Sequence, residues 1–251
     1  MAMKNIIIRE FNYHLMKDKK PSLYFNEKEK EGLFNSGFPL TLLVTLKKTE
    51  QNPVYHPEGN CWNHTMQVID NAASRREESS EPEVLMWSAL LHDIGKPSTT
   101  RIKRGRIVAY DHDRVGEKLA VKFLEFFNIE NKSQQLQNKV LSKRLISPAP
   151  EPGNVCPFLQ ETGDIFDHDL KLKWEFIKKV SKMVRWHMQM LMVIKDFPFA
   201  DVETMKKEVD LNEIALLAMC DRLGRGEITE EAINQEKKNV RLFIEKCRIH
   251  R

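Results

Sequence analysis

The stretch that most constrains the fold of this chain is Leu90–Pro97, which reads LLHDIGKP. The residues that lead into it, Val84 to Leu91, are almost all apolar and carry no charge, which is typical of a helix buried on every side. Such a helix would end in a buried imidazole, His92, next to a buried carboxylate, Asp93. Burying such groups without partners costs about 2–7 kcal/mol for a neutral polar group and far more for a charge. A shared metal ion is the most economical partner, and the negative end of the helix dipole also favours a cation.

The boundaries of this helix are predicted from its flanking residues. Ser80 and Glu83 have the spacing of a capping box, so we expect the helix to begin there. We expect Gly95 to form a left-handed C-cap and Pro97 to prevent any continuation.

Composition sets the broad class of the protein. A chain of 251 residues can bury a large core, and we expect one domain over residues 37–251 with an N-terminal extension, residues 1–36, packed on it. The net charge of +4 permits a phosphorylated substrate or RNA but demands neither. No apolar run approaches the roughly 20 residues that span a bilayer, and no signal-peptide pattern is present. Four scattered cysteines without CxxC spacing predict free thiols in the cytoplasm: Cys61, Cys156, Cys220 and Cys247.

The hydrophobic pattern predicts an all-α bundle with additional helices and one small β-hairpin over residues 99–110. The expected helices cover residues 27–36, 40–46, 61–76, 80–91, 111–127, 131–146, 170–192, 210–224 and 229 onward. Asp111, Asp210 and Thr229 are the expected N-caps of three of them, and Glu213 completes a second capping box. Residues 147–166, rich in Pro and Gly, are expected to form a long loop that could act as a lid.

Four helices besides the central one each carry a metal-competent side chain on their apolar stripe: His64, His112, His187 and Asp221. Taken singly, each has an ordinary structural explanation, as a satisfied core histidine or as a helix cap. Together with His92 and Asp93 they would place six polar groups in one core, at a heavy desolvation cost without a metal. Imidazole and carboxylate ligands without thiolate suit Mn, Fe, Co, Ni or Zn, with Mg possible. Asp93 could bind one ion or bridge two.

A bound divalent metal would lower the pKa of its water ligand from 15.7 toward about 7 and polarise a phosphoryl oxygen. We therefore predict hydrolysis of a phosphoester by a metal-bound hydroxide, which Asp93 could orient. Three basic residues are candidates for binding phosphate: Lys96, Arg114 and Arg225. Lys96 follows the His-Asp pair directly, so we count it with Asp93 as a catalytic candidate. Each of the three could instead be a solvated surface charge.

At this point the ordered motifs resemble a known family. Residues 56–70 (HPEGNCWNHTMQVID), 90–100, 111–120 and 183–188, and more loosely 221–226, are similar to the HD superfamily of metal-dependent phosphohydrolases. They are most similar to the HD region of bacterial CCA-adding tRNA nucleotidyltransferases. The resemblance implies at least five helices around the metal, with ligands His64, His92, Asp93 and Asp221. It also implies that His112 and His187 bind a second metal or the substrate.

The implied substrate is a phosphomonoester or a 2′,3′-cyclic phosphodiester, of a nucleotide or of an RNA end. The residues before His56 contain no Gly-rich loop with paired metal-binding aspartates, so we do not expect nucleotide addition. Two alternatives stay open: an HD-type di-iron oxygenase, and a non-catalytic helical RNA-binding module. The second is disfavoured because the sequence shows no basic patch interleaved with aromatic residues. The expected partner is a small phosphorylated substrate, with RNA possible and no membrane; the oligomeric state stays open.

Overall fold

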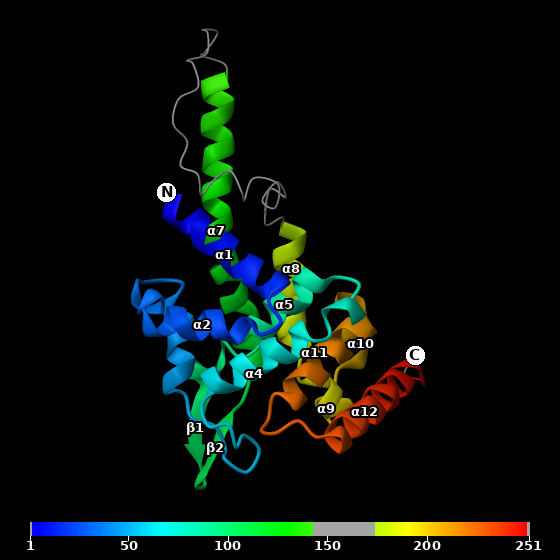
Figure 1. Cartoon of the computed structure of the whole chain (residues 1–251). Coiled ribbons are helices and arrows are strands. Elements are labelled where there is room, and N and C mark those ends of the chain that lie inside the picture. The colour runs from blue at the N-terminus through cyan, green and yellow to red at the C-terminus, as the bar shows by residue number, and fades with distance from the viewer. Residues whose placement is uncertain (1, 143–173, 250–251) are drawn as a thin grey trace.

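The computed structural model describes residues 2–142 and 174–249 of the chain. The expected lid over residues 147–166 and Cys156 lie outside these ranges. Within them the fold is helical, with a single antiparallel hairpin, so the all-α prediction is confirmed (Figure 1).

The helices and strands follow one another in a simple order. The α-helices are α1 (Ala2–Lys17), α2 (Pro21–Lys30), α3 (Thr41–Val44), α4 (Cys61–Ala73), α5 (Pro82–Leu91), α6 (Lys96–Thr99), α7 (His112–Ser142), α8 (Trp174–Trp186), α9 (Gln189–Ile194), α10 (Val202–Glu208), α11 (Leu211–Leu223) and α12 (Glu230–Ile249). The 3-10 helices are η1 (Leu33–Asn35), η2 (Thr45–Lys48) and η3 (Arg76–Glu78), and the strands are β1 (Thr100–Lys103) and β2 (Arg106–Ala109).

Several predicted boundaries differ from the observed ones. The helices expected over 111–127 and 131–146 are one helix, α7, which is continuous to Ser142. The helix expected over 170–192 is interrupted after Trp186, and α9 begins only at Gln189. The helix expected over 27–36 is shifted toward the N-terminus as α2 and is followed by η1.

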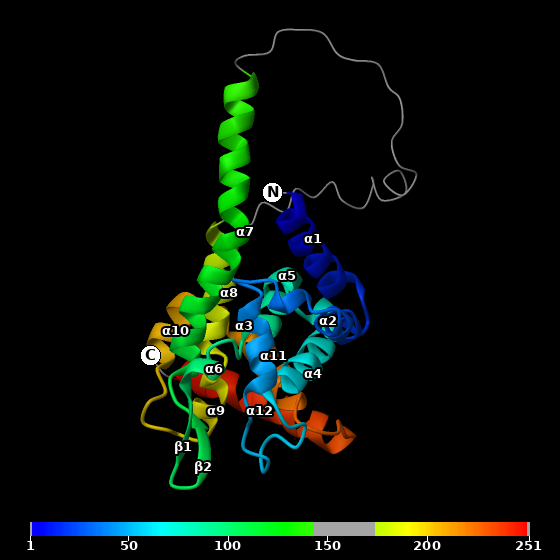
Figure 2. The same ribbon diagram turned by 90° about the vertical axis from the view of Figure 1, so that its left-hand side faces the viewer.

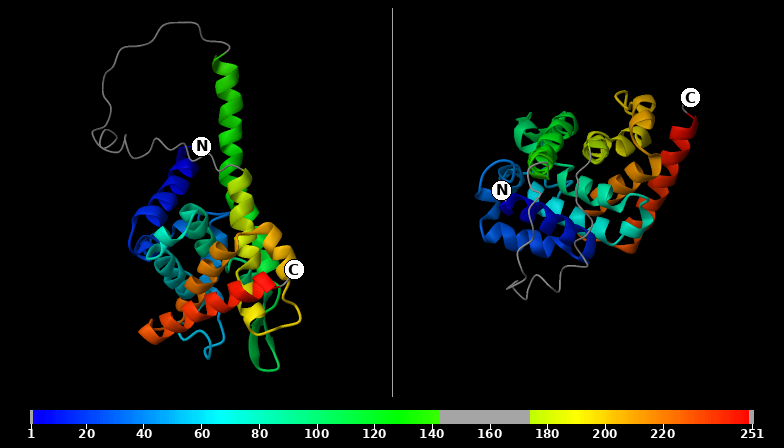
Figure 3. Two further views of the ribbon diagram at one scale, coloured as in Figure 1. Left: turned by 90° about the vertical axis from the view of Figure 1, so that its right-hand side faces the viewer. Right: turned by 90° about the horizontal axis from the view of Figure 1, so that it is seen from above.

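Helix α5 lies at the centre of the molecule and contacts α1, α4, α8 and α11 (Figures 1 and 2). Every residue from Val84 to Leu91 is buried, which confirms the prediction that this helix is surrounded on all sides. On one side, α12 packs along α11 and α9 (Figure 3). The core therefore encloses the carboxyl end of α5, where His92 and Asp93 follow.

The predicted capping box at the start of α5 is wrong. The N-cap position is Glu81, without a side-chain capping hydrogen bond. The Ser80 hydroxyl and backbone N–H instead donate to the Glu213 carboxylate, at 2.8 and 2.7 Å. At the start of α11, Asp210 is the N-cap and accepts hydrogen bonds from the N–H groups of Asn212 and Glu213. Glu213 thus joins the start of α11 to the segment before α5.

The predicted left-handed cap at Gly95 is also wrong. Its φ of −81° is open to any residue, and the absence of a side chain matters for a different reason. A Cβ at this position would lie 2.1 Å from the carbonyl oxygen of His112 and 2.7 Å from the backbone N of Gly116. Gly95 therefore allows the end of α5 and the start of α7 to come into contact. Pro97 does not end the helical path, because it occupies the first turn of α6, where proline is tolerated.

The N-terminal helices share the core of the rest of the chain. Phe11 and Phe25 are fully buried in the same apolar cluster as the residues of α5. The Trp87 indole N–H donates to Asn12 Oδ1 at 2.9 Å, and the Ser22 hydroxyl donates to Asp70 Oδ2 at 2.7 Å. The division into an extension of residues 1–36 and a domain of residues 37–251 stays a prediction.

In the described part of the chain, none of the helices combines the length and the apolar character needed to cross a membrane. Three of the cysteines are buried free thiols: Cys61, Cys220 and Cys247.

Candidate metal centre

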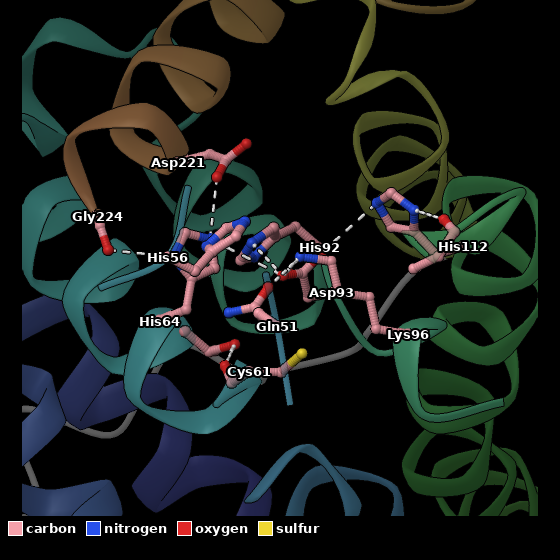
Figure 4. Close-up of polar contacts among 12 residues, drawn as sticks. Gln51, His56, Cys61, His64, His92, Asp93, Lys96, His112, Asp221 and Gly224 are labelled. Atoms are coloured by element: carbon pink, nitrogen blue, oxygen red, sulfur yellow. Dashed lines mark hydrogen bonds and ion pairs between the residues drawn. The ribbon is translucent and has the colours of Figure 1, made fainter. Parts of the chain in front are cut away.

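Five segments far apart in the sequence bring six metal-competent side chains together. Figure 4 labels His64, His92, Asp93, His112 and Asp221 among them. His64 comes from the first turn of α4, the His92–Asp93 pair follows α5, and His112 begins α7. His187 lies at the break between α8 and α9, and Asp221 lies in the last turn of α11. All six side chains are buried.

The carboxylate of Asp93 lies among the histidines. Its Oδ2 is 3.3 Å from His92 Nε2 and 3.8 Å from His64 Nε2. Its Oδ1 is 3.7 Å from His112 Nε2 and 3.9 Å from His187 Nε2. One carboxylate thus faces the same ring nitrogen of four histidines.

The backbone fixes the orientation of these rings. Three of the histidines use Nδ1 to donate to the carbonyl three residues earlier: His92 to Ala89 at 2.8 Å, His112 to Ala109 at 2.7 Å, and His187 to Val184 at 2.7 Å. Since Nδ1 carries the proton in these bonds, each neutral ring presents the lone pair of Nε2 toward Asp93. This is the arrangement of metal-binding histidines, whose second nitrogen is held by an outer hydrogen bond.

The centre contains buried polar atoms whose hydrogen bonds are not satisfied within the described residues. His92 Nε2 and Asp93 Oδ1 have no hydrogen-bond partner there. His112 Nε2 and His187 Nε2 lie 3.2 Å apart, so two lone pairs face each other. Such an arrangement is costly unless a cation lies among the atoms, and these residues therefore fit a divalent metal.

The donors form two neighbouring sets, each with ligand atoms within 4.8 Å of one another. The first set is His64, His92 and Asp221, and the second is Asp93, His112 and His187. In the first, His64 Nε2 lies 2.9 Å from Asp221 Oδ1. The geometry is compatible with one ion or with two.

The surrounding charges keep the donors in the protonation states that bind metals. Burial raises the pKa of Asp93, but the adjacent His92 and Lys96 outweigh this effect and hold its pKa well below the usual range. Asp221 behaves similarly, because Arg225 and His64 outweigh its burial and lower its pKa. Burial, with the neighbouring His112 and His92, lowers the pKa of His187 to about 4, so this ring is neutral at pH 7.

Two of the three basic residues predicted to bind phosphate lie at the centre. Lys96 Nζ is 2.7 Å from Asp93 Oδ2 and donates to Gln51 Oε1 at 2.5 Å. Arg225 Nη2 is 3.1 Å from Asp221 Oδ1. Arg114 is not brought there: its side chain is 67% exposed and, among the described residues, its ion-pair partner is Asp111, at 3.8 Å.

Sequence reasoning missed Glu58, whose side chain is only 1% exposed. Its Oε1 accepts a hydrogen bond from His56 Nδ1 at 2.8 Å. It also lies 2.9 Å from His64 Nδ1, which donates to the Gly224 carbonyl at 3.1 Å. Burial opposes ionisation of this carboxyl, but the two histidines outweigh it and lower the pKa of Glu58 to about 2. Its position between two histidines in the segment HPEGNCWNH was the available signal.

A cavity of about 800 Å³ opens onto these residues, with Asp93, His112 and Asp221 in its wall. Five cationic side chains also line it: Lys96, Arg106, Lys195, Arg222 and Arg225. The centre is therefore accessible to a small anionic molecule.

Comparison with known proteins agrees with this description. Residues 61–156 match the HD domain family, so the predicted resemblance to the HD superfamily is confirmed over that segment. The match covers less than half of the chain. The matched segment includes His64, His92, Asp93 and His112, whereas His187 and Asp221 lie beyond it and are brought to the centre by the fold.

The similar curated proteins are multifunctional CCA proteins. That of Pseudomonas fluorescens (strain SBW25) is 33% identical over 86 residues, which are 34% of this chain and 20% of the relative. That of Actinobacillus pleuropneumoniae serotype 5b (strain L20) is 33% identical over 82 residues, 32% of this chain and 19% of the relative. That of Aromatoleum aromaticum is 41% identical over 49 residues, 20% of this chain and 11% of the relative. The matches thus cover at most about a fifth of these relatives.

Proposed function

We propose that this chain is a metal-dependent phosphohydrolase that cleaves a phosphomonoester or a cyclic phosphodiester. The observation that supports this most strongly is the convergence of four histidine Nε2 atoms and two ionised carboxylates beside a cavity lined by cationic side chains. The proposed substrate is the phosphate of a nucleotide or of an RNA end. The similarity of part of the chain to proteins named multifunctional CCA proteins supports this choice.

The proposed metal ligands are His64, His92, Asp93 and Asp221, with His112 and His187 available for a second ion or for the substrate. The donor set suits Mn, Fe, Co, Ni or Zn, with Mg possible. A bound ion of this kind lowers the pKa of water and polarises a phosphoryl oxygen. Asp93 lies close to the histidines of both donor sets. In this proposal it binds the metal and orients the attacking nucleophile.

Lys96 and Arg225 are the proposed phosphate-binding residues. Burial favours the neutral amine of Lys96, but Asp93 outweighs it and raises the pKa, so the side chain stays protonated. Asp221 similarly raises the pKa of Arg225. Both cations line the cavity, where each can contact a phosphoryl oxygen while it stays paired with a carboxylate. The buried free thiols also support the proposal of a reducing, cytoplasmic location.

The test is a hydrolysis panel with metal-stripped protein reloaded separately with Mn²⁺, Co²⁺, Ni²⁺, Zn²⁺ or Mg²⁺. The substrates are nucleoside monophosphates, 2′,3′-cyclic nucleotides and a chromogenic phosphodiester. We expect metal-dependent turnover that His92→Ala and Asp93→Ala each abolish. His14→Ala, which changes a histidine paired with Asp18 far from the centre in sequence and fold, is the control. Full activity of either centre variant in a folded protein would exclude the mechanism.

A di-iron oxygenase is the second candidate, because the set Asp93, His112 and His187 adjoins the first set and could hold a second ion. Iron in the purified protein together with substrate-dependent oxygen consumption would favour it. Oxygen consumption is not expected from a phosphohydrolase, whereas bound iron alone fits either candidate.

A further inference from the structure

We infer that the β1–β2 hairpin is a docking surface for single-stranded nucleic acid, which it guides toward the cavity. This inference rests on the proposed function and narrows its substrate from a free nucleotide to the end of an oligonucleotide chain. It depends on the charge, the backbone conformation and the position of the hairpin.

The hairpin concentrates positive charge. Arg101, Lys103, Arg104 and Arg106 lie within six residues, and no acidic residue occurs between positions 96 and 110. Among the residues that the structure describes, no ion pair joins any of the four to a carboxylate. Arg101 donates only to the backbone carbonyls of Thr100 and Ser98. The four charges are thus available to an external anion.

The hairpin holds these charges at a cost to its own stability. Lys103 and Arg106 are directly paired across the two strands, and like charges in such a pair are destabilising. Arg104, at the tip, has a φ of +51°, a left-handed conformation in which Gly, Asn or Asp would be favoured. Binding of an anionic partner explains why these residues are found there despite the costs.

The hairpin extends from the body of the protein (Figures 1 and 2). Residues 106–109, which form β2, line the cavity together with Tyr110. The positively charged surface of the hairpin is therefore continuous with the cavity, whose wall includes Asp93.

Two exposed tyrosines distinguish a nucleic acid from other anions. Tyr110 and Tyr55 both line this cavity, with exposed fractions of 64% and 65%. Lys103 Nζ lies 5.4 Å from the centroid of the Tyr110 ring. Aromatic rings on a basic surface are the usual platform for unpaired bases, each stacked base contributing about 1–3 kcal/mol. An acidic peptide would pair with the cationic side chains but would not need the two tyrosine rings for binding.

The experiment measures binding without turnover. A fluorescein-labelled single-stranded RNA of 12 nucleotides is titrated with metal-free protein at several salt concentrations, and binding is followed by anisotropy. Arg101, Lys103 and Arg104, which do not line the cavity, are replaced together by Ala. The matched control removes the same charge at the junction of α1 and α2 with Lys17→Ala, Lys19→Ala and Lys20→Ala, all exposed.

We expect the hairpin variant to weaken RNA binding at least tenfold and to make the salt slope shallower by about 2, from roughly 0.7 per phosphate contact. We expect the control variant to stay within twofold of the unmodified protein. Equal losses in both variants, no RNA binding, or tighter binding to phosphatidylserine vesicles than to RNA would overturn the inference.

Hydrolysis assays separate this inference from the proposed function. If metal-loaded protein hydrolyses no phosphoester but the hairpin variant loses RNA affinity, the docking surface stands and the phosphohydrolase proposal fails. If a cyclic mononucleotide is hydrolysed and the hairpin variant binds RNA like the control, the inference fails alone. If both proposals are correct, the hairpin variant hydrolyses the oligonucleotide selectively less well. Its kcat/KM for an oligonucleotide that ends in a cyclic phosphate, divided by its kcat/KM for the cyclic mononucleotide, is about tenfold lower than in the unmodified protein.

Discussion

His112 Nε2 and His187 Nε2 face each other at 3.2 Å, although both rings already use Nδ1 to donate to backbone carbonyls. Neither nitrogen can donate to the other while the rings are neutral. The two histidines come from the start of α7 and the junction of α8 and α9, so their approach is set by the packing of these helices. The pair therefore has the geometry of a binding site for a cation, with Asp93 as the third donor.

This pair predicts a second metal ion. We expect the unmodified protein to bind two equivalents of Mn²⁺ and the His187→Gln variant to bind one, because the first set of donors stays intact. Inductively coupled plasma mass spectrometry after dialysis measures the stoichiometry, with His14→Gln as the control. Two equivalents in the His187→Gln variant would show that this pair does not bind a metal.

Glu58 is expected to tune the centre without touching the metal. Its carboxylate lies 2.9 Å from His64 Nδ1, which also donates to the Gly224 carbonyl, and outer contacts of this kind are typically worth 10–100-fold in metal affinity. Glu58→Gln should therefore weaken Mn²⁺ binding by about that factor while the protein stays folded. Glu31→Gln, which affects only a surface ion pair with Lys28, should leave the affinity unchanged. Equal Mn²⁺ affinities of the two variants would show that Glu58 does not affect metal binding.

Gly95 is expected to be essential for packing. A Cβ there would overlap the His112 carbonyl oxygen at 2.1 Å, and backbone atoms cannot move aside cheaply. Gly95→Ala should lower the free energy of unfolding by at least about 2 kcal/mol. At Gly116 the nearest atom to a new Cβ is a methyl group of Val184, at 3.0 Å, and alanine also favours the helix. In urea denaturation, the free energy of unfolding of Gly116→Ala should therefore lie within about 1 kcal/mol of that of the unmodified protein. An equally small change in Gly95→Ala would contradict the prediction.

The metal-free protein should lose stability in mild acid because of His187. Burial and the nearby His112 and His92 lower its pKa to about 4, against about 6.5 for an unfolded histidine. Between these values the unfolded chain binds more protons, so the free energy of unfolding falls as the pH falls from about 6.5 to about 4, by up to about 3 kcal/mol.

The His187→Gln variant isolates this effect. Burial opposes the charged form of His64, but Asp221 and Glu58 outweigh it and raise the pKa of His64. A raised histidine pKa stabilises the folded protein as the pH falls, and this contribution is present in both the unmodified protein and the variant. Urea denaturation in the presence of a chelator, at several pH values, should therefore show a weaker acid dependence in the variant. Identical pH dependence would show that His187 is not the responsible group.

The sequence predicted the parts of the structure that depend on local pattern. Val84–Leu91 is apolar on all sides and is buried on all sides, and the hairpin follows from two β-prone runs around Arg104 and Gly105. The convergence of the candidate metal donors was predicted from their apolar stripes, because a polar group on such a stripe must find a partner inside the protein.

The errors concern residues whose roles depend on distant contacts. Gly95 has ordinary dihedral angles, and only the approach of His112 reveals why it is glycine. The Ser80 hydroxyl donates a hydrogen bond to Glu213, 133 residues away, and does not cap α5. Arg114 lies two residues after His112 on α7 and faces solvent, because that spacing puts it on the opposite side of the helix from the inward-pointing His112. Glu58 was missed because its loop gives no periodic pattern.

The central claim is that Asp93 and the surrounding imidazoles bind a divalent metal. Titration of metal-stripped protein with Mn²⁺, followed by calorimetry, tests it most directly in the unmodified protein and in the Asp93→Asn variant, whose side chain has nearly the same shape. The account predicts saturable binding by the unmodified protein and a loss of at least a hundredfold in affinity in a folded variant. Unchanged affinity in Asp93→Asn, or no binding by the unmodified protein, would contradict it.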